Sequence, residues 1–298
     1  PAVAPDPLAR GRPAGQAGRV LTVPVRQLGD SDRRQVERIL DRDPYGAVTV
    51  AELVAVRGLS RWRGGDALYG YGGRHHLEAV CWAGAHVTPV GAGPAAVAAF
   101  GELLAGRRRR CSSIIGHADA VLELWRRLEA AWGPAREVRP DQPLLVADAP
   151  SPVGPDPQVR LARPGETDLV WPAAVRMYTE EVGVSPLAED GGRGHRARVA
   201  SLVRAGRTYV RVADGRVVFK ADVAAVSRHT AQVQGVWVAP DWRNRGVGTA
   251  AMAAVVRDVL RRVAPTVSLY VNAYNHAARR VYRRCGFYQV GTFATVLF

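Results

Sequence analysis

The residues with the clearest chemical potential form a short glycine- and arginine-rich segment in the second half of the chain. Gly246 and Gly248 stand directly before an apolar helical pattern that begins at Thr249, and Arg243 and Arg245 lie beside them. Glycine lets the backbone approach a ligand closely and adopt a positive φ angle. The first turn of a helix offers unpaired N–H groups and the positive end of the helix dipole. The spacing therefore predicts a cradle for a diphosphate, with an ordinary glycine-rich turn as the alternative.

The segments around this turn have the periodicities of a layered α/β fold. Gln232–Val238 is a valine-rich strand that stops before Pro240, and Thr249–Arg262 places its apolar residues on one helical face. Strands that alternate with helices are typical of such a fold. The other predicted elements of this half are strands at Thr208–Ala213, Arg216–Val226, Thr266–Val271 and Phe287–Phe298, and a helix at His276–Arg284.

The first half of the chain begins with the same pattern as the second. A strand at Val25–Leu28 precedes the acidic start of a helix at Asp30, and a strand at Val159–Ala162 precedes another at Glu166. The similar order in both halves predicts a tandem duplication. The further elements of the first half are expected at Val50–Arg57, Ala67–Tyr71, Leu77–Pro89, Ala95–Leu104, Ser112–Gly116 and Ala118–Trp132.

A proline-rich segment divides the chain near its middle. Residues 147–158 read ADAPSPVGPDPQ, a composition typical of a linker. Residues 1–19 lack the apolar region of a signal peptide. We therefore predict a flexible tail at 1–19, an N-terminal domain at 20–146, a linker at 147–158 and a catalytic domain at 159–298.

Two motifs in the second half resemble those of one enzyme family. Val236–Gly248 is similar to the central motif of the GNAT superfamily of N-acetyltransferases, a strand followed by Arg/Gln-x-x-Gly-x-Gly/Ala and a helix. The second signature of that family is matched by Asn275-x-x-Ala278-x-x-Val281-Tyr282-x-x-x-Gly286-Phe287. The resemblance covers 159–298 loosely and 233–288 closely. It implies a GNAT fold, an α/β fold with a mixed sheet, in two tandem GNAT-like domains of which the first is degenerate.

The resemblance also implies acetyl-coenzyme A as cosubstrate. The backbone of Val236, Trp237 and Val238 would pair with the pantetheine arm as an added strand does. Asn275 and Arg279 would lie beside that arm. The pyrophosphate would be held by Arg243, Asn244, Arg245, Gly246, Val247, Gly248 and Thr249.

Tyr282 is the residue that the resemblance places at the thioester sulfur. Acyl transfer from a thioester expels a thiolate, and a phenol with a pKa of about 10 can donate a proton to it without being ionised at neutral pH. The alternative is that Tyr282 only packs its helix against the sheet. The spacing from Asn275 favours the acid role.

The base that deprotonates the amine is less well defined by the sequence. Many relatives carry a glutamate on the strand before the cradle, whereas this chain has Gln234, which cannot act as a base. Asp222 on the preceding strand is the first substitute. Glu180, Glu181 and His229 are the other candidates.

These residues predict transfer of an acetyl group to a primary amine by direct attack. No Cys or Ser lies in a nucleophile motif, so we expect no acyl-enzyme. A coenzyme-binding regulatory protein without turnover is the alternative, because the glutamate is missing. In the N-terminal half, Gly91 and Gly93 precede a helix without an arginine ahead of them, which predicts that catalysis has been lost there.

Composition narrows the other classes of function. The apolar fraction of 47% and the charged fraction of 23% are typical of a globular protein, and we expect a cytoplasmic protein without a membrane segment. The net charge of +14 would suit nucleic acid, but the Arg107–Arg110 run has no aromatic platform or zinc-finger spacing beside it. Nucleic-acid binding is therefore the weaker reading. The sequence leaves open whether the chain forms a homodimer.

Metal, disulfide and dinucleotide sites are also disfavoured. Cys81, Cys111 and Cys285 are widely spaced and form no C-x-x-C motif, so we expect neither a structural metal nor a disulfide. Gly246-x-Gly248-x-x-Ala251 formally matches a dinucleotide fingerprint, but seven residues separate it from the preceding strand, and the acidic residue expected on the next strand is replaced by Asn272.

Overall fold

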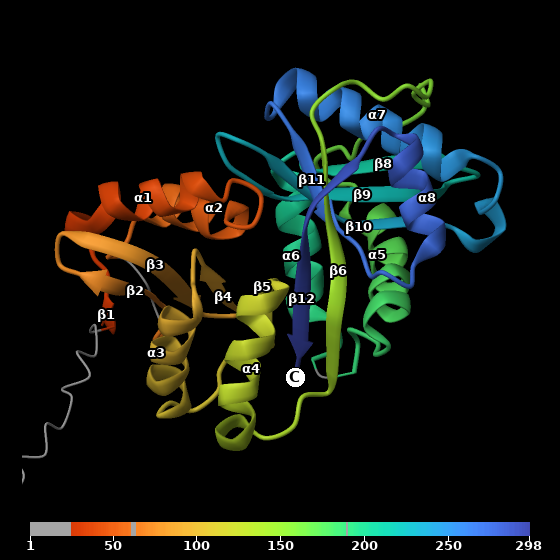
Figure 1. The fold of residues 1–298 in the computed structure, drawn as a ribbon. Helices are drawn as coiled ribbons and strands as arrows, with labels where there is room; N and C mark the ends of the chain where they lie inside the picture. The colour runs from red at the N-terminus through yellow and green to blue at the C-terminus, as the bar shows by residue number, and fades with distance from the viewer. Residues whose placement is uncertain (1–24, 61–63, 189) are drawn as a thin grey trace, which may run out of the picture.

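Twelve strands form one continuous mixed sheet in the computed structural model, which describes residues 25–60, 64–188 and 190–298. The tail predicted at 1–19 lies outside the described residues. Helices cover both faces of the sheet in each half of the molecule (Figure 1). Among the described helices, none is both long enough and apolar enough to cross a membrane.

The N-terminal half follows the predicted order of elements closely, with two strands more than predicted. The strand expected at Leu77–Pro89 is divided into His76–Ala83 and Val87–Val90, and a further strand follows at Glu137–Ala147. This last strand, β6, contains Pro140 and Pro143, and prolines within an apolar run argue against an inner strand. The elements are β1 Val25–Gln27, α1 Arg33–Arg42, α2 Val48–Arg57, β2 Ala67–Gly73, β3 His76–Ala83, β4 Val87–Val90, α3 Pro94–Ala105, β5 Ser113–His117, α4 Ala118–Trp132 and β6 Glu137–Ala147.

The C-terminal half repeats this arrangement. In both halves antiparallel strands are followed by one parallel pair that a helix connects, β4 with β5 and β10 with β11. The predicted α/β class is therefore confirmed. The elements are β7 Arg160–Leu161, α5 Thr167–Val182, α6 Arg193–Arg204, β8 Thr208–Ala213, β9 Arg216–Val226, β10 Ala231–Val238, α7 Val247–Arg262, β11 Val267–Tyr270, α8 His276–Arg284 and β12 Tyr288–Leu297.

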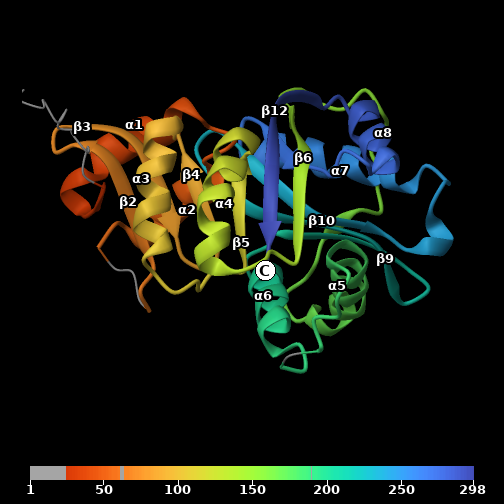
Figure 2. The ribbon, with the colours of Figure 1, turned by 60° about the horizontal axis from the view of Figure 1, so that its bottom comes forward.

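The two halves share strands at the centre of the sheet. The strand order is β1-β2-β3-β4-β5-β12-β6-β11-β10-β9-β8-β7, so β12 lies between β5 and β6 (Figure 2). Phe293 of β12 pairs with His117 of β5, and Leu145 of β6 pairs with Leu269 of β11. Each half thus receives a strand from the other. The halves on either side of the segment 147–158 therefore share one continuous sheet.

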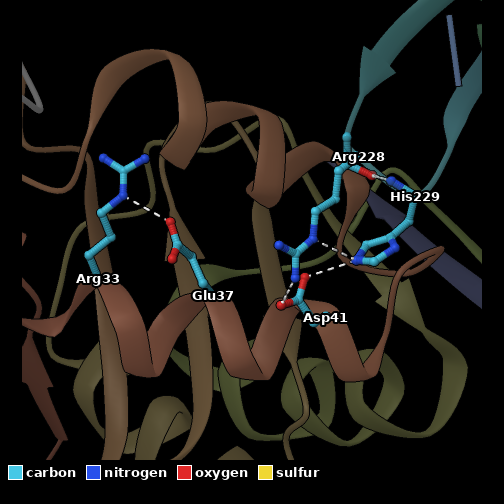
Figure 3. Close-up of polar contacts among 6 residues, drawn as sticks. Arg33, Glu37, Asp41, Arg228 and His229 are labelled. Atoms are coloured by element: carbon cyan, nitrogen blue, oxygen red, sulfur yellow. Dashed lines mark hydrogen bonds and ion pairs between the residues drawn. The ribbon is translucent and has the colours of Figure 1, made fainter.

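Ion pairs join the helices of the N-terminal half to the sheet of the C-terminal half. Glu52 on α2 accepts hydrogen bonds from Arg207 Nη1 at 2.6 Å and from the backbone N–H of Val226 at 3.2 Å. Asp41 on α1 binds Arg228, and its Oδ1 lies 2.9 Å from Nε2 of His229 (Figure 3). The halves are therefore joined by specific charged contacts as well as by the shared strands.

Candidate active site

The turn between β10 and α7 has the backbone conformation that its sequence predicts. Asn244 and Gly246 adopt positive φ angles of 60° and 78°, and Gly246 caps α7. A Cβ atom at Gly248 would lie only 3.2 Å from Cγ2 of Val238, so a larger residue would push the helix from the strand. The first amides of α7 have no partner within the helix. The turn can therefore present backbone N–H groups to an anion.

Glu180 on α5 fixes this turn to the strand before it. Its carboxylate accepts hydrogen bonds from Trp237 Nε1 at 3.1 Å and from Arg243 Nη2 at 2.6 Å. Arg243 also donates through Nε to the carbonyl of Val238 at 3.0 Å. Glu180, one of the candidate bases, is thus occupied with two donors. The same contacts hold Arg243 beside the amides of the turn.

The parallel strands β10 and β11 diverge after two residue pairs. Ala231 pairs with Val267 and Gln232 pairs with Ser268, and the described pairing ends there. Farther along β10, the register with β9 shifts around Gly235, whose φ is 58°. Within the described sheet, the edge of β10 that carries Val236–Val238 therefore has no strand partner. This edge can accept an extended ligand as an added strand.

A cavity of about 460 Å³ opens where the two strands diverge. Its wall combines residues of α5, α6, β6, β9, β10, β11 and the start of α8. Several predicted site residues come together there: Asp222, Glu180, Glu181, Gln234, Val236, Trp237, Asn275 and Tyr282. The cavity wall does not include Val238, the turn residues from Arg243 to Thr249, Arg279 or His229.

Tyr282 on α8 lines this cavity and is largely buried. It is 7% exposed, and its ring packs edge-on against Phe287 with a centroid distance of 5.7 Å. Burial raises the pKa of the Tyr282 phenol above its ordinary value, and the negative charge of Glu181 adds to this effect. The phenol therefore keeps its proton at neutral pH and can give it to a thiolate.

Asn275 and Arg279 hold the start of the helix that carries Tyr282. Oδ1 of Asn275 accepts a hydrogen bond from the backbone N–H of Ala278 at 3.1 Å, which caps α8. Arg279 donates to the carbonyl of Ala273 at 3.0 Å. Their predicted place beside the coenzyme arm stays a prediction. These hydrogen bonds hold the first turn of α8 in place.

Asp222 lies in the cavity wall but is engaged with other side chains. It accepts hydrogen bonds from Nζ of Lys220 at 2.6 Å and from Oγ1 of Thr208 at 2.8 Å. Lys220 is 1% exposed and also donates to the carbonyl of Gly235 at 3.1 Å. Lys220 thus ties Asp222 to the bulge of β10. A proton taken up by Asp222 would weaken that tie.

The other candidate bases differ in position. Glu181 lines the cavity and remains exposed to solvent, and the protein around its carboxyl raises the pKa of that group by desolvation. The charges of Arg139 and Lys220 oppose that rise. Gln234 donates to Oε1 of Gln232 at 3.0 Å. His229 lies at the contact with α1, so the structure does not bring it to the cavity.

Several cavity residues were not predicted from the sequence. His195 and Arg198 on α6 and Tyr178 on α5 line the side away from α8. The ring of His195 lies 4.8 Å from that of Tyr178, and burial lowers the pKa of the imidazole, which keeps it neutral. Lys220 did offer a signal, because it is the only lysine in a strongly arginine-rich chain.

The corresponding turn of the N-terminal half differs from the turn before α7. Gly91 has a φ of 67°, and a Cβ atom there would lie 3.3 Å from Cγ2 of Ile39. Pro94 occupies the first turn of α3 and has no N–H to offer. This turn therefore presents fewer backbone donors to an anion, and the loss of catalysis in this half stays a prediction.

No metal centre is evident among the residues that the structure describes. Within 25–60, 64–188 and 190–298, no group of three or more His, Cys, Asp or Glu side chains could hold an ion. Cys81, Cys111 and Cys285 are buried and free of disulfides.

Comparison with protein families agrees with this geometry. Residues 171–287 match the acetyltransferase (GNAT) family, and residues 66–170 match a domain of unknown function, DUF4081. The chain thus carries a GNAT-family acetyltransferase domain in its C-terminal half. A search among curated proteins found no significant match.

Solved structures share the fold across both halves. A Drosophila protein aligns with a TM-score of 0.64 at 14% identity over 92% of this chain and 98% of its own. A GCN5-related N-acetyltransferase from Sphaerobacter thermophilus aligns with a TM-score of 0.59 at 16% identity over 92% and 95%. A tandem GNAT protein from the clavulanic acid biosynthesis pathway gives 0.50 at 16% identity over 92% and 98%. The predicted GNAT fold in tandem is confirmed.

Proposed function

We propose that this protein transfers an acetyl group from acetyl-coenzyme A to a primary amine. The observation that carries the proposal is the cavity between β10 and β11, which joins an unpaired strand edge to the buried phenol of Tyr282. A coenzyme arm that follows Val236–Val238 would enter this cavity. The amides and arginines of residues 243–249 would hold the pyrophosphate.

The proposed reaction is a direct displacement. The amine nitrogen forms a bond with the acetyl carbon, and the carbon–sulfur bond breaks. Tyr282 gives its proton to the departing sulfur, and a base takes one proton from the nitrogen. The products are an N-acetyl amine and the free thiol of coenzyme A, and solvent exchange restores both protein groups.

Asp222 remains our first proposed base, with Glu181 as the strongest alternative. Asp222 would act while Lys220 and Thr208 hold its carboxylate in place. Glu181 lines the cavity without an ion pair in the described chain, and desolvation raises the pKa of its carboxyl, which makes the carboxylate a stronger base. Comparing Asp222→Asn with Glu181→Gln separates the two roles by their pH–rate profiles.

The test combines coenzyme binding with turnover. Calorimetry should detect acetyl-coenzyme A binding to the wild-type chain, and Gly248→Val should weaken it by roughly tenfold or more, since a side chain there collides with Val238. The matched control is Gly154→Val, at an exposed glycine with no atom within 4 Å of an added Cβ. Unchanged binding by Gly248→Val would refute the cradle.

Turnover is then followed as thiol release with a panel of amines. Release that requires both acetyl-coenzyme A and an amine supports the proposed enzyme. Coenzyme binding without release for any amine would instead favour the regulatory alternative, in which the cavity binds the coenzyme and lacks an effective base.

A further inference from the structure

The side of the cavity formed by α5 and α6 presents one unpaired positive charge. Arg198 on α6 lines the cavity and makes no ion pair or hydrogen bond with another described residue. Its neighbour on the same helix, Arg196, is paired with Asp168. The other cation of the wall, Lys220, is neutralised by Asp222. The positive charge of Arg198 therefore remains available to a ligand.

The same cavity presents one unpaired negative charge. Within the described chain, the carboxylate of Glu181 forms no ion pair, and only its backbone carbonyl is used, by Arg139 at 2.7 Å. Glu180 and Asp222, the other carboxylates of the wall, are each held by a basic side chain. Among the charged groups of the cavity wall, the carboxylate of Glu181 and the guanidinium of Arg198 are therefore the ones without an ion-pair partner in the described chain.

The two free charges stand on different helices of the wall. Glu181 lies near the end of α5, and Arg198 lies on α6, one turn after His195. Both helices line the same cavity as Tyr282. A ligand in this cavity can therefore meet a negative and a positive group on separate elements.

We infer that the acceptor is a small amine that also carries an anionic group, with its nitrogen toward Glu181 and its anionic group bound by Arg198. This inference rests on the proposed acetyl transfer and names the acceptor class for the same cavity. The arginine fork matches a carboxylate or a phosphate with two parallel hydrogen bonds. Such a contact fixes the free end of the acceptor while leaving its amine at the thioester.

The size of the cavity argues for a small acceptor. A volume of about 460 Å³ is within the usual range for small-molecule sites, of roughly 300–1,000 Å³, and part of it must hold the acetylated end of the coenzyme. A polyamine would place additional positive charge near Arg198 without a carboxylate to receive it. The net charge of +14 opposes highly cationic acceptors for the same reason.

Matched pairs of acceptors test this inference. Thiol release is measured for ω-amino acids of increasing chain length and for the corresponding amides, which keep the amine and lose only the negative charge. Aminoalkyl phosphates form a third arm that separates a carboxylate preference from a phosphate preference. We expect at least one anionic series to exceed its neutral counterpart in kcat/KM by roughly tenfold or more, as hydrogen bonds to charged groups allow.

Substitution of the arginine should remove that preference. Arg198→Gln should raise KM for the anionic acceptors, so that the ratio of kcat/KM between each acid and its amide falls toward one. Arg204→Gln, at an exposed arginine on the same helix that does not line the cavity, is the matched control and should keep the preference. Equal rates for acids and amides in the wild type would overturn the inference while leaving acetyl transfer intact.

A binding measurement distinguishes failure of this inference from failure of the proposed reaction. Calorimetry with coenzyme A present measures the affinity of the same acids and phosphates without turnover. Binding that Arg198→Gln abolishes would support the anionic acceptor site even if no amine is acetylated, in which case only the proposed reaction fails. The absence of any such binding and of any anionic preference in turnover would overturn the inference.

Discussion

Tyr282 combines two requirements of a proton donor, a buried position and an intact phenolic proton. Replacing Tyr282 with Phe removes the hydroxyl and preserves the ring that packs against Phe287. We therefore expect kcat to fall by roughly 10²-fold or more, because general-acid catalysis contributes about 10²–10⁴-fold. Steady-state thiol release checks this effect.

The coenzyme affinity of the same variant serves as the internal control. Calorimetry should give Tyr282→Phe nearly the wild-type affinity for acetyl-coenzyme A, since the hydroxyl is needed for proton donation. A loss of affinity with unchanged kcat would instead assign Tyr282 a packing or binding role.

At the scale of residues, the sequence predicted backbone conformation well where a motif fixes it. It predicted side-chain partners less well, because these depend on contacts between distant parts of the chain. Gly246 adopts the positive φ expected from its place before α7. Asp222 was the first candidate for the catalytic base. The structure pairs its carboxylate with Lys220, a contact that no local spacing indicates. Arg198 lies on a helix whose pattern gave no sign of the cavity, because the cavity forms only when α6 packs against α5 and β9.

At the scale of elements, the residue that follows α1 contacts the end of β5 through a histidine whose charge depends on pH. Nε2 of His117, at the end of β5, lies 2.9 Å from Oδ2 of Asp43, and this hydrogen bond raises the pKa of His117 above its ordinary 6.5 despite partial burial. A raised folded-state pKa means that the stabilisation is fully present below pH 6.5. It is lost as the pH rises through the folded-state value.

His117→Gln should therefore destabilise the protein more at about pH 6 than at about pH 9, where the wild-type imidazole is neutral. Urea unfolding of both chains across this range measures the difference in the free energy of unfolding. We expect a modest effect, because the side chain of His117 is 39% exposed and solvent screens the pair. A difference that does not change with pH would contradict the assignment.

The elements themselves were largely predictable because their apolar periodicity is strong. The strands Thr208–Ala213 and Arg216–Val226 and the helix His276–Arg284 have the predicted bounds. The missed strand β6 carries two prolines whose lost N–H groups normally exclude an inner position. The break between β3 and β4 was also missed, because the apolar run Leu77–Pro89 reads as one strand. The bulge at Gly235 could not be predicted, since it arises from the register between β10 and β9.

At the scale of the whole molecule, the shared strands make the two halves depend on one another. A fragment of residues 148–298 keeps the GNAT motifs but lacks β6, which pairs with both β11 and β12. It also lacks Gln142, which lines the cavity and donates to Asn272 at 2.8 Å. We expect this fragment to unfold without a cooperative transition and to lose coenzyme binding.

A fragment that begins at residue 134, after α4, retains β6 and is the matched comparison. Circular dichroism with thermal melting should show a cooperative transition for this longer fragment only. If residues 148–298 alone unfolded cooperatively and bound acetyl-coenzyme A with wild-type affinity, the dependence on β6 would be disproved.

The position of β12 has a consequence for how the protein is made. This strand follows every other described element in the sequence, yet it fills the gap between β5 and β6. During synthesis those two strands must wait, with unpaired backbone edges, until residues 288–297 have left the ribosome. Exposed strand edges are templates for association with other chains. The yield of folded protein in a cell therefore depends on how quickly the nascent chain inserts β12.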